Sequence, residues 1–395
     1  MTKLTRPITP GIIFFIISLF QCIPAVSYAF ETGKNINKQT PVPSGYNIYH
    51  VKTTGELYKA LRKIRSRFGH GAIILADGVY KLNRQLLINV PHIMMLSESR
   101  HPEKVIIKGQ GMRKHSRVDN LINVQASHFV LDGITLQEAG NHLIQIAAYK
   151  NADNLVIRNC ILKDSYQQMI KVNFNLSVNT DTYSDGGLIE NCFFGYTNDR
   201  GPNYYIGGID AHGIRGWVIR NNIFKNIASP GKRISEFAIH LWTNSSNNLV
   251  ENNIIIDCDR GIGFGMKQAH KNIQYGNKGG RIINNLIYHS NNGDPFADVG
   301  ISLASSPDTI IQQNHIFMEH PYPNAIEYRF SNTRNILIKS NRTNKPIKSR
   351  NDASADLENN YLNLSRKDFF SIYYQKLRLL EKRMAYNIKS IISTE

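Results

Sequence analysis

One position in the chain carries asparagine or cysteine about every thirty residues. It falls within the short apolar segments VIRNCIL, LIENCFF, VIRNNIF, LVENNII, IINNLIY, IQQNHIF and LENNYLN. The column contains Cys160, Cys192, Asn222, Asn253, Asn285, Asn314, Asn341 and Asn360. Consecutive members are 32, 30, 31, 32, 29, 27 and 19 residues apart. This spacing is typical of one turn of a solenoid.

A second kind of apolar segment alternates with the first. Its copies are HLIQIAA, QMIKVNF, GGIDAHG, FAIHLWT, RGIGFGM, VGISLAS and NAIEYRF, each with period-two alternation around a central isoleucine. Two strands per turn, joined at Gly and Asn, predict an all-β parallel β-helix. Equivalent side chains then stack about 4.8 Å apart, so amides can bond to the amides above and below. We interpret the asparagine column as structural, with Cys160 and Cys192 as small fillers of the same column.

Helical patterns are expected only at the two ends. Thr53 and Glu56 form a capping-box pattern before an apolar stripe at Leu57, Leu61 and Ile64, which predicts an N-terminal capping helix. A second stripe predicts a C-terminal amphipathic helix that packs on the last coil, the alternative being a helix on a membrane surface. Its members are Phe370, Tyr373, Leu377, Leu380, Met384, Ile388 and Ile391. The predicted organisation is a signal peptide over 1–29, an N-terminal segment with the capping helix over 30–71, the β-helix over 72–364 and a helical segment over 365–395.

The first residues resemble an export signal. Lys3 and Arg6 precede the apolar run from Gly11 to Phe20, and Ser27 and Ala29 are small residues where a signal peptidase would cut. We expect cleavage after Ala29, a periplasmic or secreted protein and no stable membrane span afterwards. An uncleaved anchor is the alternative, although the apolar run is short for a bilayer.

The charge of the chain favours an anionic partner. Removal of Lys3 and Arg6 with the signal lowers the formal charge from +17 to +15. A field of this sign suits an acidic polysaccharide, an anionic membrane surface or a nucleic acid, and export argues against nucleic acid. The three cysteines after the signal are an odd number, which argues against a disulfide scaffold. We expect a monomer.

With these repeats the chain resembles the right-handed parallel β-helix, pectin-lyase-like superfamily across roughly residues 45–364. Members of this superfamily include lyases, hydrolases, epimerases, esterases and binding proteins. The resemblance therefore implies the fold and leaves the reaction open.

Two columns of side chains are expected on the outer face of the second segments. With the central isoleucine inward, the next residue and the one two further on point outward. The first column reads Gln145, Lys171, Asp210, His240, Gly263, Ser302 and Glu327, and the second reads Ala147, Asn173, His212, Trp242, Gly265, Ala304 and Arg329. Titratable residues gather on three successive coils, and small residues follow them. The pattern predicts a polar patch beside a groove, although such side chains can also serve only to support neighbouring coils.

This set of side chains suits removal of the C5 proton of a uronic acid, which needs a base and a group that neutralises the carboxylate. His212 is the candidate base, and Asp210 is expected to orient a histidine. The candidates for neutralising the carboxylate are Lys171, Asn173 and His240, and Trp242 offers a face for sugar stacking. Further groove contacts are expected from Arg260, Lys267 and Arg329. Arg260 has the alternative of bonding carbonyls in a Gly-rich turn.

The segment IDAHGIRGWVIRNN is similar to the D-P-H-D region of β-helix mannuronate epimerases. Asp210 and His212 match the first Asp and the His of this motif, and the resemblance implies that His212 is the base. Ala211 and Gly213 stand where the motif has the Pro and the second Asp. The K-S-x-x-N and R-H-G elements of chondroitinase-B and alginate-lyase relatives are absent from the sequence, as is the D-D element of polygalacturonases.

We therefore expect a lyase or uronate epimerase that acts on an acidic polysaccharide and requires no cofactor. A polysaccharide-binding or cell-surface protein without catalysis is the first alternative. A glycoside hydrolase is the second, but Asp210 and Glu327 lie four coils apart, about 19 Å, which is too far for a carboxylate pair. Hydrolysis would need loop carboxylates such as Asp181 or Asp199. No metal site is predicted, although Asp257 and Asp259 leave calcium open.

Overall fold

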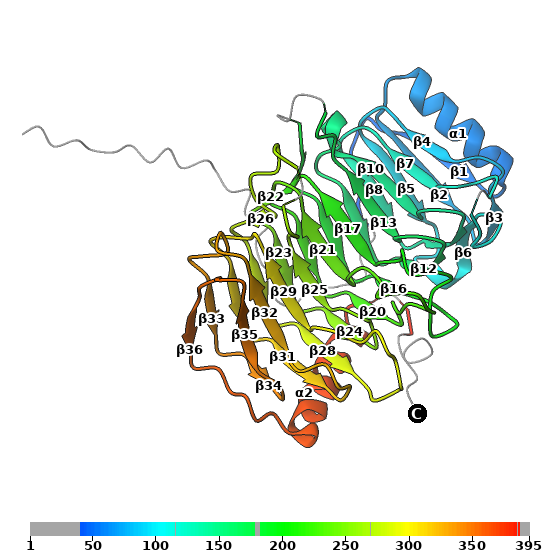
Figure 1. The fold of residues 1–395 in the computed structure, drawn as a ribbon. Coiled ribbons are helices and arrows are strands. Elements are labelled where there is room, and N and C mark those ends of the chain that lie inside the picture. Colours follow the sequence, from blue (N-terminus) through cyan, green and yellow to red (C-terminus); the bar gives the residue numbers. More distant parts are fainter. Residues whose placement is uncertain (1–39, 115, 178–181, 269, 385, 388–395) are drawn as a thin grey trace, which may run out of the picture. The chain divides into compact units, whose positions relative to one another are not determined.

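The computed structural model describes residues 40–387 except 115, 178–181, 269 and 385. The predicted signal peptide lies outside these residues. Three long parallel sheets run along the described part of the chain (Figure 1). Successive strands of each sheet come from successive turns of the chain, and buried isoleucine, leucine, valine and phenylalanine side chains fill the space between the sheets. The chain is a parallel β-helix, as the repeats predict.

Sheet 1 contains twelve strands among the described residues. In order they are β1 (Asn47–Val51), β2 (Gly71–Leu75), β5 (Ile93–Ser97), β8 (Phe129–Asp132), β11 (Val156–Arg158), β15 (Leu188–Glu190), β19 (Val218–Arg220), β23 (Leu249–Glu251), β27 (Arg281–Ile283), β30 (Ile310–Gln312), β33 (Leu337–Lys339) and β36 (Asp356–Glu358). Because β1 pairs in parallel with β2, this sheet starts before the capping helix in the sequence.

Sheet 2, which carries the candidate site, contains ten strands in the described part of the chain. They are β4 (Leu86–Ile88), β7 (Ile122–Val124), β10 (Ile144–Ala147), β13 (Ile170–Asn173), β17 (Ile209–His212), β21 (Ile239–Trp242), β25 (Ile262–Phe264), β29 (Ile301–Ala304), β32 (Ile326–Arg329) and β35 (Ile347–Arg350). These strands are the second segments of the sequence repeat. Their predicted inward isoleucines are all buried: Ile144, Ile170, Ile209, Ile239, Ile262, Ile301 and Ile326.

Sheet 3 also has ten strands within the described ranges. They are β3 (Gly78–Lys81), β6 (Val105–Lys108), β9 (Thr135–Ala139), β12 (Ile161–Ser165), β16 (Phe193–Gly195), β20 (Ile223–Lys225), β24 (Ile254–Ile256), β28 (Leu286–His289), β31 (His315–Met318) and β34 (Arg342–Thr343). A small fourth sheet pairs β14 (Ser184–Asp185), β18 (Ile214–Arg215), β22 (Ser245–Ser246) and β26 (Asn277–Lys278). Two short 3₁₀ helices, η1 (Pro102–Lys104) and η2 (Ala148–Lys150), lie between strands.

The prediction of two strands per turn is wrong, because each first segment is bent into two. VIRNNIF supplies β19 of sheet 1 and β20 of sheet 3, with Asn221 and Asn222 at the bend. Asn221 has φ +56°, in the left-handed region that asparagine tolerates better than most residues, so the chain turns there within one residue. The alternation of apolar residues does not show such a bend, because the side chains on both sides of it are apolar.

The asparagine column at this bend is confirmed as a buried ladder. Asn253 is fully buried; its side-chain amide donates to Ile219 O and to Asn285 Oδ1, both at 3.0 Å. Its Oδ1 accepts from the backbone N–H and the side chain of Asn222, also at 3.0 Å. Cys192 continues the column, since its backbone N–H donates to Asn222 Oδ1 at 2.9 Å. Cys160, Cys192 and Cys258 are all free and buried.

Replacing Asn253 by alanine is expected to destabilise the protein by about 3 kcal/mol or more, because it leaves several buried donors and acceptors of neighbouring coils unpaired. The matched control is Asn360→Ala at the end of the ladder, where the side chain is only partly buried. Its cost should be about half as large or less, since fewer buried partners are lost. Urea unfolding would measure both, and equal costs would contradict a ladder that acts through burial.

The capping helix α1 (Thr54–Ser66) is confirmed together with its capping box. Thr53 accepts from the Glu56 backbone N–H, and Glu56 Oε2 accepts from the Thr53 N–H at 3.1 Å. Leu57, Leu61 and Ile64 are buried in the same apolar core that fills the β-helix. The helix therefore closes the first coil, and Figure 1 shows it at one end of the stack of strands.

The C-terminal helix α2 (Arg366–Glu381) does not pack on the last coil as predicted. Phe369, Tyr373 and Leu380 pack on outward apolar side chains of sheet 3. Those side chains are Ile161, Phe193, Ile223, Ile254, Ile256, Leu286, Tyr288 and Phe317. Because several first segments carry apolar residues on this outer face as well as inside, α2 is needed as a cover along the flank.

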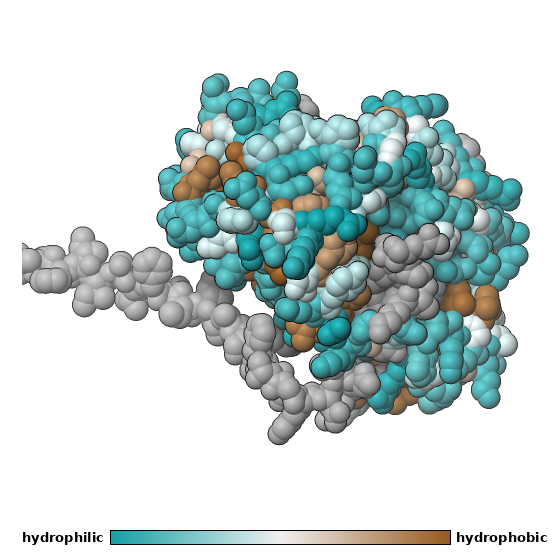
Figure 2. All heavy atoms as spheres, turned by 90° about the horizontal axis from the view of Figure 1, so that it is seen from below, coloured by the Kyte–Doolittle hydropathy of each residue, from teal (hydrophilic) through white to brown (hydrophobic). Residues whose placement is uncertain are grey.

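The described part of the predicted stripe, from Phe370 to Met384, packs on this flank, which is not expected of a helix that binds a membrane through the same stripe. Ile388 and Ile391 lie outside the described residues. Figure 2 shows a mainly hydrophilic surface from below, with separate brown patches. Within the described residues, no helix combines the length and the apolar character needed to cross a membrane.

Candidate active site on the outer face of sheet 2

The register of sheet 2 confirms the first column from Gln145 to Glu327 and, in the second column, the pairs of Ala147 with Asn173, His212 with Trp242 and Ala304 with Arg329. Lys171 on β13 pairs with Asp210 on β17, and Asp210 pairs with His240 on β21. His212 pairs with Trp242 in the second column. Parallel pairing without a bulge therefore brings side chains that are 30 or more residues apart into contact, and the polar patch predicted from the sequence exists.

Asp210 lies at the centre of the patch and is only 2% exposed. Its Oδ2 accepts from Lys171 Nζ at 2.5 Å, and its Oδ1 accepts from Trp242 Nε1 at 2.6 Å. Burial by itself would raise the pKa of this carboxyl, but the Lys171 ammonium, and then the imidazoles of His212 and His240, hold the pKa well below its usual range. Asp210 is therefore an ionised anchor that holds Lys171 and Trp242, whereas its predicted role is to orient a histidine; His212 Nε2 lies 3.6 Å from its Oδ1.

His212 is held in one tautomer by two neighbours. Its Nε2 lies 3.0 Å from Lys171 Nζ and 3.6 Å from Asp210 Oδ1. An ammonium can only donate, so Nε2 accepts and Nδ1–H donates to Thr243 Oγ1 at 3.0 Å. Burial, reinforced by the Lys171 ammonium, lowers the pKa of His212 to about 3, although Asp210 acts in the opposite direction. The imidazole is therefore neutral near pH 7, and its side chain is 17% exposed.

Thr243 is a hydrogen-bond partner of His212 that sequence reasoning missed. It follows β21 with φ +55°, and the next residue, Asn244, has φ +60°. Two consecutive non-glycine residues in the left-handed region are costly, at about 1 kcal/mol or more each. This turn directs the Thr243 hydroxyl at His212. The sequence WTNSS does not predict this contact, because the contact depends on the backbone conformation of the turn.

His240 does not reach the surface, which corrects its predicted role as a partner of the substrate carboxylate. The side chain is 0% exposed, its Nε2–H donates to Gly265 O at 3.0 Å, and its Nδ1 lies 3.4 Å from Glu236 Oε2. Its ring stacks on the Trp242 indole at a centroid distance of 4.9 Å. His240 therefore supports Trp242 from below. The indole of Trp242, two residues further along the same face of β21, covers the His240 ring. The sequence pattern does not show which of the two side chains lies above the other.

The other predicted groove residues are spread along sheet 2, and among them Asn173 lies beside His212, because the residues before them, Val172 and Ala211, are paired. Asn173 is partly exposed at the end of β13, and Lys267 is exposed after β25. The Arg260 guanidinium donates twice to Ser235 O, at 3.0 and 2.6 Å, and lies over the Phe237 ring. Arg260 therefore bonds a neighbouring carbonyl, which is the alternative to a groove contact. Arg329 lies on β32, four strands from β17, or about 19 Å along the sheet.

The carboxylates considered for hydrolysis are not next to Asp210. Asp199 Oδ1 accepts from Asn226 Nδ2 at 3.0 Å, directly after β20, so it lies at sheet 3. Glu327 accepts from Tyr322 and Asn324, and it pairs with Arg350 at 2.9 Å. Asp181 lies outside the described residues.

Gly213 explains one departure from the epimerase motif. It has φ +60°, and a Cβ there would come within 2.1 Å of the Phe174 ring. An aspartate at this position would therefore clash and be strained. Ala211 is fully buried and points into the core. The second Asp of D-P-H-D thus has no room here, whereas Ala211 occupies an inward strand position whose partners are Val172 and Leu241.

Calcium binding at Asp257 and Asp259 stays a prediction. Asp259 is fully buried and accepts from the backbone N–H groups of Ser229 and Ser235, and Asp257 accepts from Ser290. Among the described residues, no three His, Cys, Asp or Glu side chains come together as a metal-binding group.

A buried histidine beside the patch makes stability depend on pH. His142 Nδ1 bonds to Gln168 O at 2.9 Å, and burial lowers the pKa of His142 to about 4. The unfolded chain binds a proton below about pH 6.5 that the folded chain does not, so this stability is present above that pH and is lost as the pH falls towards 4. As the pH is lowered from 7 to 4, the free energy of unfolding of His142→Gln should therefore rise relative to that of the wild type by up to about 3 kcal/mol. Urea midpoints would test this, and a constant difference would contradict it.

No family model and no curated protein matches the chain. Solved structures with TM-scores above 0.5 share the fold. A protein described as a glycoside hydrolase has a TM-score of 0.57 at 9% identity, over 87% of this chain and 99% of that one. The catalytic domain of a GH87 alpha-1,3-glucanase, in complex with tetrasaccharides, has a TM-score of 0.53 at 16% identity, over 83% of this chain and 60% of that one. A PL6 family polysaccharide lyase from Pseudopedobacter saltans has a TM-score of 0.44 at 13% identity, over 81% of this chain and 94% of that one.

Proposed function

We propose that this protein is a carbohydrate-active enzyme that abstracts the C5 proton of a uronate in an acidic polysaccharide, as a lyase or an epimerase. The observation that supports it best is the position of Lys171 Nζ, 2.5 Å from Asp210 Oδ2 and 3.0 Å from His212 Nε2. An ammonium and a neutral imidazole thus meet on an outer face of a strongly basic protein, whose formal charge is +17. An exported protein that meets acidic polysaccharide outside the cell fits this charge.

The two accessible groups divide the work. Lys171 has three N–H donors, and the bonds to Asp210 and His212 use two of them, so a substrate carboxylate can take the third. When that carboxylate draws the ammonium away from His212, the lone pair on Nε2 becomes available. Nε2 then takes the C5 proton, and the electron pair of the C5–H bond moves into the carboxylate as an enolate that Lys171 stabilises.

The enolate has two exits. In a lyase, the electron pair returns to form a C4–C5 double bond while the C4–O bond breaks, and the leaving oxygen takes the proton that His212 holds. In an epimerase, C5 receives a proton from water on its opposite face, His212 releases its proton to solvent, and no chain bond breaks. Trp242, partly exposed beside His212 with ring centroids 4.1 Å apart, would carry the sugar ring in both cases.

One observation favours a second candidate, a polysaccharide-binding protein without catalysis. Asp210, Lys171 and His212 satisfy one another in the absence of substrate, as a network that only shapes a surface would do. Lys171 and Trp242 would then be the binding residues.

The deciding experiment incubates the purified protein in heavy water with polygalacturonate, alginate and sulfated glycans. Ultraviolet absorbance of unsaturated ends would establish a lyase, and deuterium at C5 without chain cleavage would establish an epimerase. Binding of a polyuronate with neither signal would overturn the enzyme proposal and support the binding protein.

A further inference from the structure

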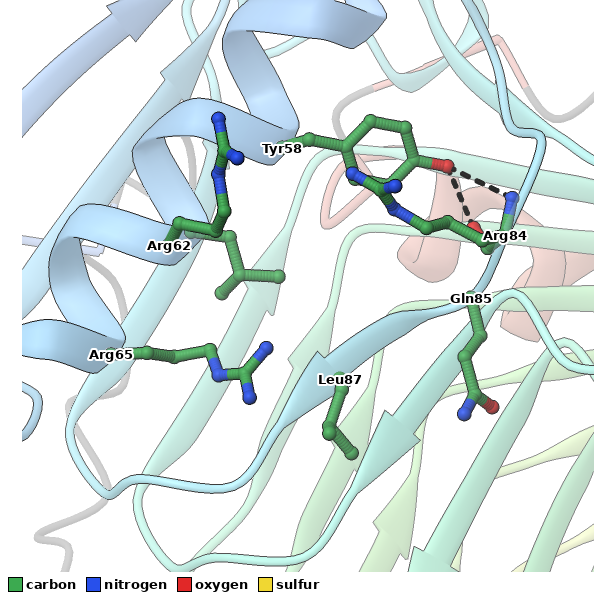
Figure 3. A pocket seen from close by; sticks show the side chains of 7 residues that line it. Tyr58, Arg62, Arg65, Arg84, Gln85 and Leu87 are labelled. Carbon is green, nitrogen blue, oxygen red and sulfur yellow. Dashed lines mark hydrogen bonds between the residues drawn. The ribbon is translucent and has the colours of Figure 1, made fainter.

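The capping helix α1 is strongly basic on the side that faces strand β4. Between Thr54 and Ser66 it carries four basic residues and one acidic residue. Arg62 and Arg65 lie beside a hollow of about 480 Å³ that α1 forms with the segment leading into β4. Figure 3 shows the side chains around it, with Arg65 extending from the helix toward Leu87. The lining residues are Tyr58, Leu61, Arg62, Arg65, Arg84, Gln85 and Leu87.

Tyr58 fastens the two sides of this hollow together. Its hydroxyl donates to Arg84 O at 2.7 Å and accepts from the backbone N–H groups of Asn83 and Arg84, at 3.2 and 3.1 Å. The Arg84 guanidinium stacks over the Tyr58 ring, 4.3 Å from its centroid. A rigid aromatic ring and fixed backbone bonds thus hold one cation of the hollow in place.

The three guanidinium groups have no acidic partner in the described part of the chain. No ion pair among the described residues includes Arg62, Arg65 or Arg84, although other surface arginines, such as Arg215 with Asp185, are paired. Three like charges around one hollow repel one another unless an anion lies between them. A planar guanidinium also suits bidentate binding of a carboxylate better than an ammonium does.

The hollow opens onto the same face that carries the candidate active site. Leu87 in its lining pairs with Asn123 on β7, Asn123 pairs with Gln145 on β10, and Gln145 pairs with Lys171 on β13. Leu87 is therefore the first member of the outward column that leads to Asp210. The path covers three strand spacings, about 14 Å.

The floor between the two places is lined with side-chain amides. Asn123 donates to Gln85 at 3.5 Å and accepts from Gln125 at 3.3 Å, while Asn120 donates to Gln145. Gln85 is exposed, and Asn123, Gln125 and Gln145 are partly exposed. Neutral amides can bond to sugar hydroxyls without repelling a negatively charged chain. The outer face of sheet 2 between the hollow and Lys171 thus has cations at both ends and hydrogen-bonding groups between them.

We propose that the hollow formed by Arg62, Arg65 and Arg84 is a distal subsite that binds a carboxylate of an acidic polysaccharide whose reacting uronate lies at Lys171 and His212. The inference rests on the proposed function for its choice of ligand. A chain that spans both places gains charge-assisted bonds at each end, so length determines affinity. A short fragment engages one end only.

The test compares galacturonate and mannuronate oligosaccharides of increasing length, from disaccharides upward, on the full chain. For chains long enough to reach from Lys171 to the hollow, Arg62→Gln/Arg65→Gln should weaken binding by about tenfold or more, and for disaccharides by less than about twofold. Lys63→Gln removes the same kind of charge from the same helix, but its ammonium lies over the Tyr49 ring, 5.9 Å from the centroid. This control should leave the length dependence unchanged.

Three results would overturn the subsite: no loss in the double variant, an equal loss for short and long chains, or an equal loss in the control. Binding of sulfated glycans but of no uronate oligosaccharide would overturn the choice of ligand. The test separates the two proposals, because turnover is measured on the same samples. Turnover without a length effect would support the enzyme proposal and contradict the subsite. A length effect without turnover would support the subsite and contradict the enzyme proposal.

Discussion

Replacement of His212 by alanine is expected to reduce turnover of a polyuronate by about 10²-fold to 10⁴-fold, the range that a positioned general base contributes. The structure makes this residue the accessible imidazole of the patch, since His240 is covered by Trp242 and bonded to Gly265. Substrate binding should change by less than about threefold, because Lys171 and Trp242 remain. Steady-state kinetics and direct binding measurements would separate the two effects.

Two further variants make this result specific. Thr243→Val keeps the shape of the residue that holds Nδ1 and removes its hydroxyl, so turnover should fall by a smaller factor with little loss of stability. His50→Ala is the matched control, because His50 lies on β1 of sheet 1, away from the patch. If His212→Ala weakened binding and turnover in parallel, the histidine would be a contact residue and the base would have to be sought elsewhere.

Replacement of Lys171 by methionine is expected to destabilise the protein by about 3 kcal/mol or more at neutral pH. The reason is the Asp210 carboxylate, which is 2% exposed and would lose the ammonium 2.5 Å from Oδ2. Asp210→Asn should cost less, since the freed ammonium is partly exposed and the amide oxygen can still accept from Trp242. The double variant should recover part of the loss, with a coupling energy of about 1 to 3 kcal/mol.

The dependence of this cost on pH gives a second readout. In the wild type, the lowered pKa of Asp210 contributes stability that is present above about pH 4 and is lost as the pH falls through the folded pKa. Without Lys171, burial dominates and raises the pKa, so a proton taken up by Asp210 relieves the variant. The difference between Lys171→Met and the wild type should therefore shrink as the pH is lowered. Urea unfolding at several pH values would measure it; a difference that grew in acid would show that Asp210 is not the group affected.

Pattern reasoning from the sequence reached the strand register because a solenoid repeats one geometry. Once Ile209 is inward, Asp210 and His212 must be outward, and the coil spacing then fixes Lys171 and Trp242 as their neighbours. It failed at the bend of Asn221 and at the place of α2. The bend and the position of α2 both depend on which apolar side chains face the core and which face outward under α2. The apolar periodicity of the sequence does not distinguish these two faces.

The sequence by itself determined the β-helix, the asparagine ladder, the capping helix and the membership of the polar patch, because each follows from spacing along the chain. Only the tertiary structure decided which members of the patch are exposed and which are covered. Trp242 covers His240, Lys171 sets the tautomer of His212 while Thr243 accepts from its Nδ1–H, and Lys171 neutralises Asp210. These outcomes depend on side-chain size, backbone conformation and burial across neighbouring coils, which residue names in a column do not carry.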